Sequence, residues 1–127
     1  MRLIKHNPSD MKSSKVLSYA VQVDDVIFTS GLTPRDPVSG EIVTGGIAIQ
    51  AKVAFENLRR VLDSAGVTVA DVAKVNVYLT SIEDAGAMNE VYVQFFGDHR
   101  PARTTVEVSS LTPGMLIEVE AVVAARS

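Results

Sequence analysis

Alternating apolar and polar positions predict strands in both the N-terminal and the C-terminal parts of the chain. The segment from Tyr19 to Val23 alternates, an Asp-Asp turn follows, and VIFTSG forms a second predicted strand. Near the other end, TTVEVSSL and MLIEVEAVVAA alternate on either side of a Thr-Pro-Gly turn at 112–114. The β-branched and aromatic residues of these segments favour strands over helices.

The spacing changes to three and four residues in the middle of the chain, which predicts an amphipathic helix. This helix runs from Ile47 to Ala65, and Gly66 follows as its C-cap. Its apolar stripe consists of Ile47, Ala51, Ala54, Leu58, Val61, Leu62 and Ala65. The preceding segment, 33–46, is rich in Pro, Gly, Asp and Ser and predicts a loop, with a short strand at Glu41–Val43.

A further strand and a second helix follow. VAKVNVYLTS alternates, with Val75, Val77 and Leu79 on one face and polar residues or tyrosine on the other. Ser81 and Asp84 have the spacing of an N-terminal helix cap. The second helix ends near glycine 97, and its inner face carries Met88, Val91, Tyr92 and Phe95.

The order β-β-α-β-α-β-β predicts an α+β fold in which both helices cover one face of a single mixed sheet. The length of 127 residues fits a single domain, 1–127. The second face of the sheet would then be apolar and uncovered. We therefore expect an oligomer in which that face meets a partner.

Composition excludes several classes of function. The net charge of −3 and the scattered basic residues give no basic face for nucleic acid. The chain has no cysteine, and its two histidines, His6 and His99, lack metal-ligand spacing, so we expect no metal. We also expect no cofactor and no membrane partner. The N-terminus lacks a signal-peptide pattern, which favours a cytoplasmic protein.

The charged residues of the last two strands are the first candidates for chemistry. Glu118 and Glu120 project on the same face of a strand that also carries apolar residues, so at least one acid is expected to have a partner. Arg103 lies just after Pro-Ala at the start of the preceding strand. The spacing by itself predicts a salt bridge between Arg103 and one of these acids. The alternative is that its planar guanidinium binds the carboxylate of a ligand.

Other polar residues have ordinary structural interpretations from the sequence alone. Tyr19 fits a half-buried strand tyrosine, and Asn89 a capping or packing contact. Ser30 has no His–Asp arrangement around it, which argues against a serine triad. Gly31 either ends a strand or allows a ligand close to the backbone.

The segments together resemble the RidA family, also called the YjgF/YER057c/UK114 family, of reactive-intermediate enamine/imine deaminases. RPARTTVEVSSLTPGMLIEVEAVVAA is close to that family's C-terminal signature, and SYAVQV and IFTSG are similar to its N-terminal segments. AFENLRRVLDSAGVTVADVAKVNVYLTS and NEVYVQFF resemble its helices and the strand between them. The similarity covers the chain from about Ser18 onward.

The resemblance implies a chorismate-mutase-like fold and a homotrimer whose sheets form a central barrel, with ligand sites between subunits. It implies that Arg103 binds the substrate carboxylate and that Glu118 positions the attacking water. The other implied pocket residues are Tyr19, Ser30, Gly31 and Asn89. Many catalytic members have cysteine where this chain has Thr105, which changes the shape of the implied pocket.

The implied reaction is the hydrolysis of 2-enamine or 2-imine acids, such as 2-aminoacrylate and 2-iminopropanoate, to 2-keto acid and ammonia. An imine carbon is already electrophilic, so the reaction needs orientation, a water and a proton relay. Three alternatives remain: a trimer that binds small carboxylates without turnover, a pathway-specific aminomuconate or 3-aminoacrylate deaminase, and an RNA-cleaving inhibitor of translation. The acidic balance and the absence of a histidine pair disfavour the last.

Overall fold

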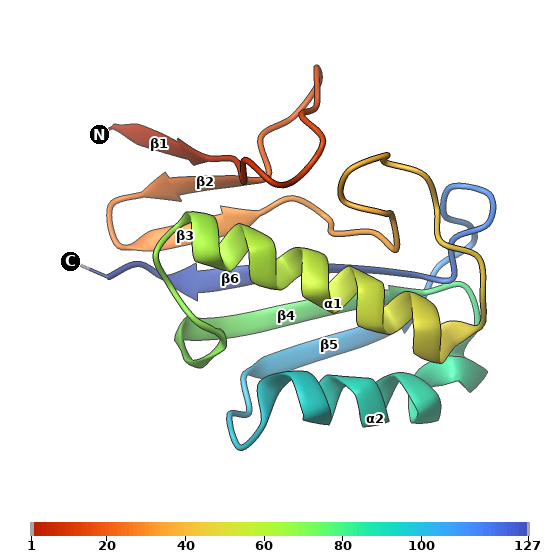
Figure 1. Ribbon diagram of the computed structural model, residues 1–127. Helices are drawn as coiled ribbons and strands as arrows, with labels where there is room; N and C mark the ends of the chain where they lie inside the picture. The colour runs from red at the N-terminus through yellow and green to blue at the C-terminus, as the bar shows by residue number, and fades with distance from the viewer. Residues whose placement is uncertain (1, 127) are drawn as a thin grey trace.

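The computed structural model describes residues 2–126 and contains one mixed sheet and two α-helices (Figure 1). The strands are β1 (Leu3–His6), β2 (Ala20–Val23), β3 (Val26–Thr29), β4 (Val72–Leu79), β5 (Ala102–Glu107) and β6 (Ile117–Ala124). The helices are α1 (Ile47–Ser64) and α2 (Ala85–Phe96), and the 3₁₀ turns are η1 (Val69–Asp71) and η2 (Ile82–Asp84).

The strands lie in the order β1-β2-β3-β6-β4-β5. Only β4 and β5 are parallel neighbours, and α2 connects them as the crossover of a βαβ unit. The last strand, β6, is inserted between β3 and β4 and pairs with both in antiparallel fashion. The residues of β6 therefore lie at the centre of the sheet.

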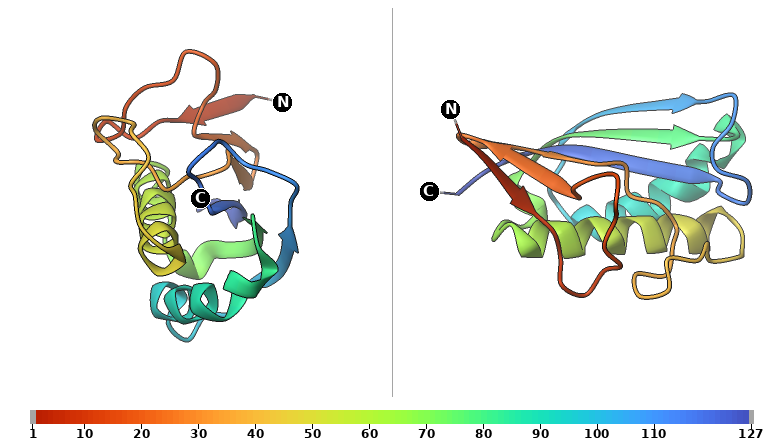
Figure 2. Two further views of the ribbon diagram at one scale, coloured as in Figure 1. Left: turned by 90° about the vertical axis from the view of Figure 1, so that its right-hand side faces the viewer. Right: turned by 90° about the horizontal axis from the view of Figure 1, so that it is seen from above.

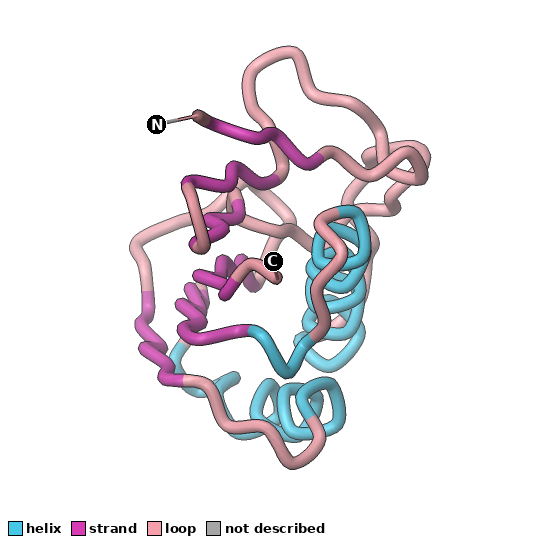
Figure 3. Tube along the Cα trace, turned by 90° about the vertical axis from the view of Figure 1, so that its left-hand side faces the viewer, coloured by secondary structure: helices cyan, strands magenta, loops and turns pink. Residues whose placement is uncertain are grey.

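Both helices pack against the same face of the sheet, which confirms the α+β prediction (Figure 2). The side view in Figure 3 separates the molecule into a strand layer and a helix layer. Alternate residues of β4 and β6 are buried beneath the helices: Val75, Val77, Leu79, Ile117, Val119, Ala121 and Val123. Among the described residues, neither helix is long and apolar enough to cross a membrane.

An aromatic cluster joins the two helices. Phe55 of α1 is fully buried, and its ring centroid lies 5.7 Å from that of Tyr92 and 5.2 Å from that of Phe95, both on α2. Tyr92 also packs on Phe96, with centroids 4.7 Å apart. These contacts fix α2 against the core, because aromatic pairs in tilted and edge-to-face arrangements stabilise more than their buried area alone.

No segment of residues 2–126 covers the opposite face of the sheet. Phe28 is 50% exposed, Val106 is 40% exposed and Val26 is 37% exposed, although all three lie in strands. Val122 of β6 lies beside Phe28 in the register and is only half-buried. The sheet thus carries the exposed apolar face that the sequence predicted.

Strand boundaries differ from the predictions in several places. Strand β1 is not predicted by the sequence pattern, because LIKH has no alternation and its residues are mostly exposed. The predicted strand at Glu41–Val43 is reduced to a single bridge between Arg35 and Ile42. The predicted strand TTVEVSSL begins earlier, at Ala102, and ends at Glu107, because only this stretch pairs with β4.

The caps of the second helix also differ from the prediction. Ser81 does act as a cap, since its hydroxyl accepts a hydrogen bond from the Glu83 N–H, but it caps the turn η2. The α-helix itself begins only at Ala85.

The end of the first helix agrees with the prediction. Gly66 follows the C-terminus of α1 with a φ of +73°, which is the left-handed conformation that favours glycine there.

Candidate functional site

Arg103 lies on β5 and projects toward α2. Its partner in the register is Val75, whose side chain is buried on the helix side of the sheet. The Nη1 group of Arg103 donates a hydrogen bond of 2.7 Å to Asn89 Oδ1. Its Cζ lies 4.7 Å from the centre of the Tyr92 ring, so the guanidinium stacks on a buried aromatic surface. Two residues of α2 therefore hold Arg103 in place.

The predicted salt bridge between Arg103 and Glu118 or Glu120 is wrong. The ion pairs found within residues 2–126 involve Arg59, Arg60 and Arg126. Arg103 lies over α2, whereas both acids lie on the opposite face of the sheet. Its other N–H groups remain available to a ligand.

The surface around Arg103 forms an open hollow of about 380 Å³. It is lined by Asn89, Tyr92, Val93, Arg100, Pro101 and Arg103. Thr105 follows Arg103 on the same face of β5, and its hydroxyl is buried without a hydrogen-bond partner in the described chain. A buried hydroxyl without a hydrogen-bond partner is energetically costly.

Glu118 lies on the uncovered face of the sheet, at the second position of β6. It is opposite Tyr78 of β4, and two residues further along β6 the Glu120 carboxylate accepts a hydrogen bond from the Tyr78 hydroxyl. Burial raises the pKa of Glu118, and the nearby negative charge of Glu120 raises it further. The positive charge of Arg35 lowers the same pKa by a smaller amount. The same hydrogen bond, with burial, raises the pKa of Tyr78 to about 12.

Gly31 provides the space that the Glu118 side chain occupies. A Cβ added at this position would overlap Glu118 Oε2 and would lie 2.7 Å from Glu118 Cδ. Any side chain at position 31 would therefore displace the carboxylate. The Gly31 N–H has no hydrogen-bond partner among the described residues, so a donor lies beside this carboxylate.

Tyr19 and Ser30 are close to Gly31 and are held by backbone contacts. The Ser30 hydroxyl donates to the Ser18 carbonyl at 2.6 Å, and the Ser30 N–H donates to the Tyr19 carbonyl at 2.8 Å. The Tyr19 hydroxyl donates to the Lys12 carbonyl at 2.7 Å. Tyr19 and Gly31 both line a small cavity of about 40 Å³. The structure thus brings Tyr19, Ser30, Gly31 and Glu118 together in one region.

The predicted site residues therefore form two groups on opposite faces of one sheet. Arg103 and Thr105 pair with Val75 and Val77, whose side chains lie under the helices. Glu118 pairs with Tyr78, which projects from the other face of β4. Because neighbouring residues in register project on the same side, Arg103 and Glu118 of one chain point away from each other. One chain cannot bring both to the same ligand.

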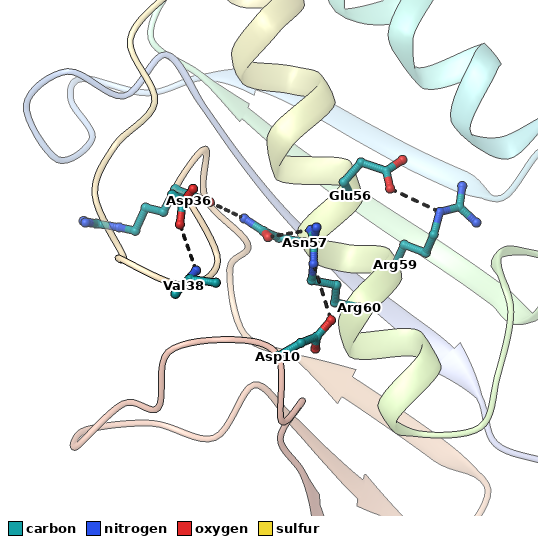
Figure 4. Close-up of polar contacts among 8 residues, drawn as sticks. Asp10, Asp36, Val38, Glu56, Asn57, Arg59 and Arg60 are labelled. Atoms are coloured by element: carbon teal, nitrogen blue, oxygen red, sulfur yellow. Dashed lines mark hydrogen bonds and ion pairs between the residues drawn. The ribbon is translucent and has the colours of Figure 1, made fainter.

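A buried asparagine fixes the loop that follows Gly31 (Figure 4). Asn57 of α1 is 1% exposed, and its Nδ2 group donates to the carbonyls of Thr33 and Arg35 at 2.9 Å each. Arg60 Nη1 donates to the Asn57 Oδ1 atom at 3.2 Å, and Arg60 also pairs with Asp10. The loop that carries Arg35 toward Glu118 is thereby attached to α1.

We expect Asn57→Ala to lower the free energy of unfolding by about 2 kcal/mol, because the carbonyls of two half-buried residues lose their donor. Urea denaturation measures the change. Glu56→Ala on the same helix is the control: its exposed pair with Arg59 contributes less than about 0.5 kcal/mol. Equal effects of the two substitutions would contradict the role of Asn57 in holding the loop.

Sequence reasoning missed Asn57, Arg35 and Arg100 and treated Tyr92 only as a core residue. The sequence does contain a signal for Asn57: this polar residue lies three residues after Ala54, on the apolar face of the predicted helix. Tyr92 and Arg100 had none, because their relation to Arg103 depends on how α2 packs beside β5. The role of Arg35 depends equally on the path of a loop.

The sheet order and the two helices on one face define an α+β fold that is found in other solved structures. The yeast protein YEO7 superimposes with a TM-score of 0.93 at 32% identity, and the match covers 98% of this chain and 100% of that one. A family model described as Endoribonuclease L-PSP matches residues 8–125. The chain belongs to this family, which confirms the RidA (YjgF) resemblance found from its sequence.

Two relatives show what the family includes. A RutC family protein of Pyrococcus abyssi is 48% identical over 105 residues, which are 83% of each chain. The human protein named 2-iminobutanoate/2-iminopropanoate deaminase is 43% identical over 105 residues, which cover 83% of this chain and 77% of the human one. The family thus includes deaminases of imino acids at substantial identity to this chain.

Proposed function

We propose that this protein is a hydrolytic deaminase of 2-imino and 2-enamine acids, with sites between the subunits of a homotrimer. The carrying observation is Arg103, a guanidinium fixed by Asn89 and Tyr92 that has no acidic partner within residues 2–126. Such a group is arranged to bind a carboxylate. The human deaminase at 43% identity supports the same substrate class.

The proposed assembly rests on the two groups of site residues, one around Arg103 and one around Glu118, which lie on opposite faces of the sheet. Arg103 and Glu118 point away from each other within one chain, so a site that uses both takes Arg103 from one subunit and Glu118 from its neighbour. The exposed apolar sheet face around Phe28 and Val106 supplies a surface for association. A closed ring of three subunits repeats this contact, with three sites and with the sheets at the centre as a barrel.

In the proposed reaction, Arg103 binds the carboxylate next to the imine carbon, and the Gly31 N–H is a second donor. Glu118 of the neighbouring subunit accepts a proton from a water as the water oxygen attacks that carbon. Glu118 then returns this proton to the nitrogen. The carbinolamine loses ammonia as its hydroxyl proton passes through Glu118 to the leaving group, which gives the 2-keto acid.

The environment of Glu118 suits these transfers. A carboxyl group whose pKa is raised by burial and by Glu120 both accepts and returns a proton more readily at neutral pH than an ordinary glutamate does. Tyr78 keeps Glu120 oriented through its hydrogen bond. The chemistry asks for no metal and no bound cofactor.

Two variants test the proposal, each on a different step. Arg103→Lys is expected to weaken binding of a 2-keto acid about 10- to 100-fold, because an ammonium cannot replace the two-pronged guanidinium contact. Glu118→Gln is expected to retain that binding and to lose about 100-fold or more in the rate of imine decay. Calorimetric titration and an imine-decay assay measure the two effects, and thermal melts check folding.

The outcomes separate the candidate functions. A protein that binds 2-keto acids through Arg103 but does not accelerate imine decay is a carboxylate-binding protein without turnover. If Arg103→Lys unfolds the protein while activity per folded molecule is kept, Arg103 is structural and the proposed site is wrong.

We also expect Glu120→Gln to move the acidic limb of the pH–rate profile toward lower pH. Glu118 acts as a base only when it is deprotonated, so the rate rises as pH passes its raised pKa. Removing the negative charge of Glu120 removes one cause of that raised value, and the pKa of Glu118 falls. Rates measured from acidic to neutral pH show the shift. An unchanged limb would mean that another group controls it.

A further inference from the structure

The hollow around Arg103 contains a second guanidinium that the proposed reaction does not use. Arg100 and Arg103 both line it, and the other lining residues, Asn89, Tyr92, Val93 and Pro101, include no acid. Neither arginine takes part in the ion pairs found among the described residues. The hollow of about 380 Å³ therefore has two positive charges and no internal negative charge.

Contacts with the backbone hold Arg100 at this surface. Its Nη1 group donates to the carbonyls of Gly97 and His99, in the turn that leaves α2. A guanidinium has five N–H donors, so those on Nε and Nη2 remain for a ligand. Arg100 and Arg103 are three positions apart in the sequence, and even a fully extended chain places their Cα atoms at most about 10 Å apart.

Tyr92 lines the same hollow, and Arg103 stacks on its ring. Its side chain is only 5% exposed, and its hydroxyl has no hydrogen-bond partner in the described chain. The Cζ of Arg103 lies 4.7 Å from the centre of the Tyr92 ring, and Arg100 lines the same hollow. Burial raises the pKa of Tyr92, and the positive charges of Arg103 and Arg100 lower it.

We infer that the preferred substrates are 2-imino dicarboxylates, with Arg103 on the carboxylate beside the reacting carbon and Arg100 on the distal carboxylate. A dicarboxylate neutralises both cations, whereas a monocarboxylate neutralises only one. This inference rests on the proposed deaminase function and specifies the substrate class of the same site.

The test compares imines formed in the assay by amino-acid oxidases from glutamate and from alanine. We expect kcat/KM for 2-iminoglutarate to exceed that for 2-iminopropanoate by about tenfold or more, the effect of one additional hydrogen-bonded charge pair. Arg100→Gln should lower this ratio by about tenfold or more. Arg59→Gln is the matched control: Arg59 stacks on the Phe95 ring at 4.7 Å but lies outside the hollow, so the ratio should not change.

A binding titration separates failure of this inference from failure of the deaminase proposal. Calorimetry with 2-oxoglutarate and with pyruvate requires no turnover, and the expected result is tighter binding of 2-oxoglutarate that depends on Arg100. If imines are hydrolysed but Arg100→Gln affects both substrates equally, the dicarboxylate inference is wrong and the deaminase proposal stands. If 2-oxoglutarate binds through Arg100 but no imine is hydrolysed, the deaminase proposal fails and the dicarboxylate site stands.

Discussion

Mixed trimers made from two inactive variants are expected to recover about one quarter of the wild-type activity. Arg103→Ala removes the carboxylate-binding group, and Glu118→Gln removes the proton acceptor. When each site takes Arg103 from one subunit and Glu118 from the next, random mixing in equal amounts leaves about one site in four with both native residues. The physical basis is the register, which places the two side chains on opposite faces of the sheet.

The experiment requires subunits that assemble together, which co-expression with two different affinity tags provides. Sedimentation of the purified mixture checks that it is trimeric. The two variants purified separately and mixed without subunit exchange are the control and should remain inactive. Activity that stays at the level of the separate variants in verified mixed trimers would place the whole site within one subunit and contradict the proposed assembly.

Gly31→Ala is expected to lower the rate of imine hydrolysis by about 100-fold, because a displacement of about 1 Å at a catalytic group has effects of this size. The new Cβ would overlap the Glu118 carboxylate and would lie 2.7 Å from its Cδ, so the side chain must move. The backbone at Gly31 has no left-handed φ, so alanine introduces no backbone strain. The loss should therefore appear mainly in the rate.

Gly86→Ala is the matched control for this substitution. Gly86 is an exposed residue of α2, and a Cβ at this position would have no atom within 4 Å. Gly86 is the second residue of α2, so alanine should raise the free energy of unfolding by at most about 0.5 kcal/mol, less than in a helix interior, and leave the rate unchanged. If Gly31→Ala keeps the wild-type rate, the position of the Glu118 carboxylate is not important for turnover.

The sequence predicted the elements whose periodicity is strong. Helix α1 was expected over Ile47–Ala65 and is found over Ile47–Ser64, because its apolar stripe repeats over many residues. The alternation of β4 and β6 is equally regular, and the faces assigned within each strand are correct. Short strand β1 has no such pattern, and its existence depends on pairing with β2.

The candidate residues could be named from the sequence, but their arrangement could not. The alternation of apolar and polar residues predicts which residues of one strand share a face. It does not predict which strands are neighbours in the sheet. The insertion of β6 between β3 and β4 depends on contacts between residues far apart in the chain. That insertion places Glu118 beside Gly31 and away from Arg103.

What the sequence alone determined is local: the helices, the alternating strands, and the presence of an arginine and two glutamates at strand positions. Only the tertiary structure decided that Arg103 stacks on Tyr92, that Glu120 bonds to Tyr78, and that Arg100 shares the hollow of Arg103. The physical reason is that side-chain periodicity arises from the backbone geometry of a few consecutive residues. The surroundings of a charged group arise instead from the packing of distant segments.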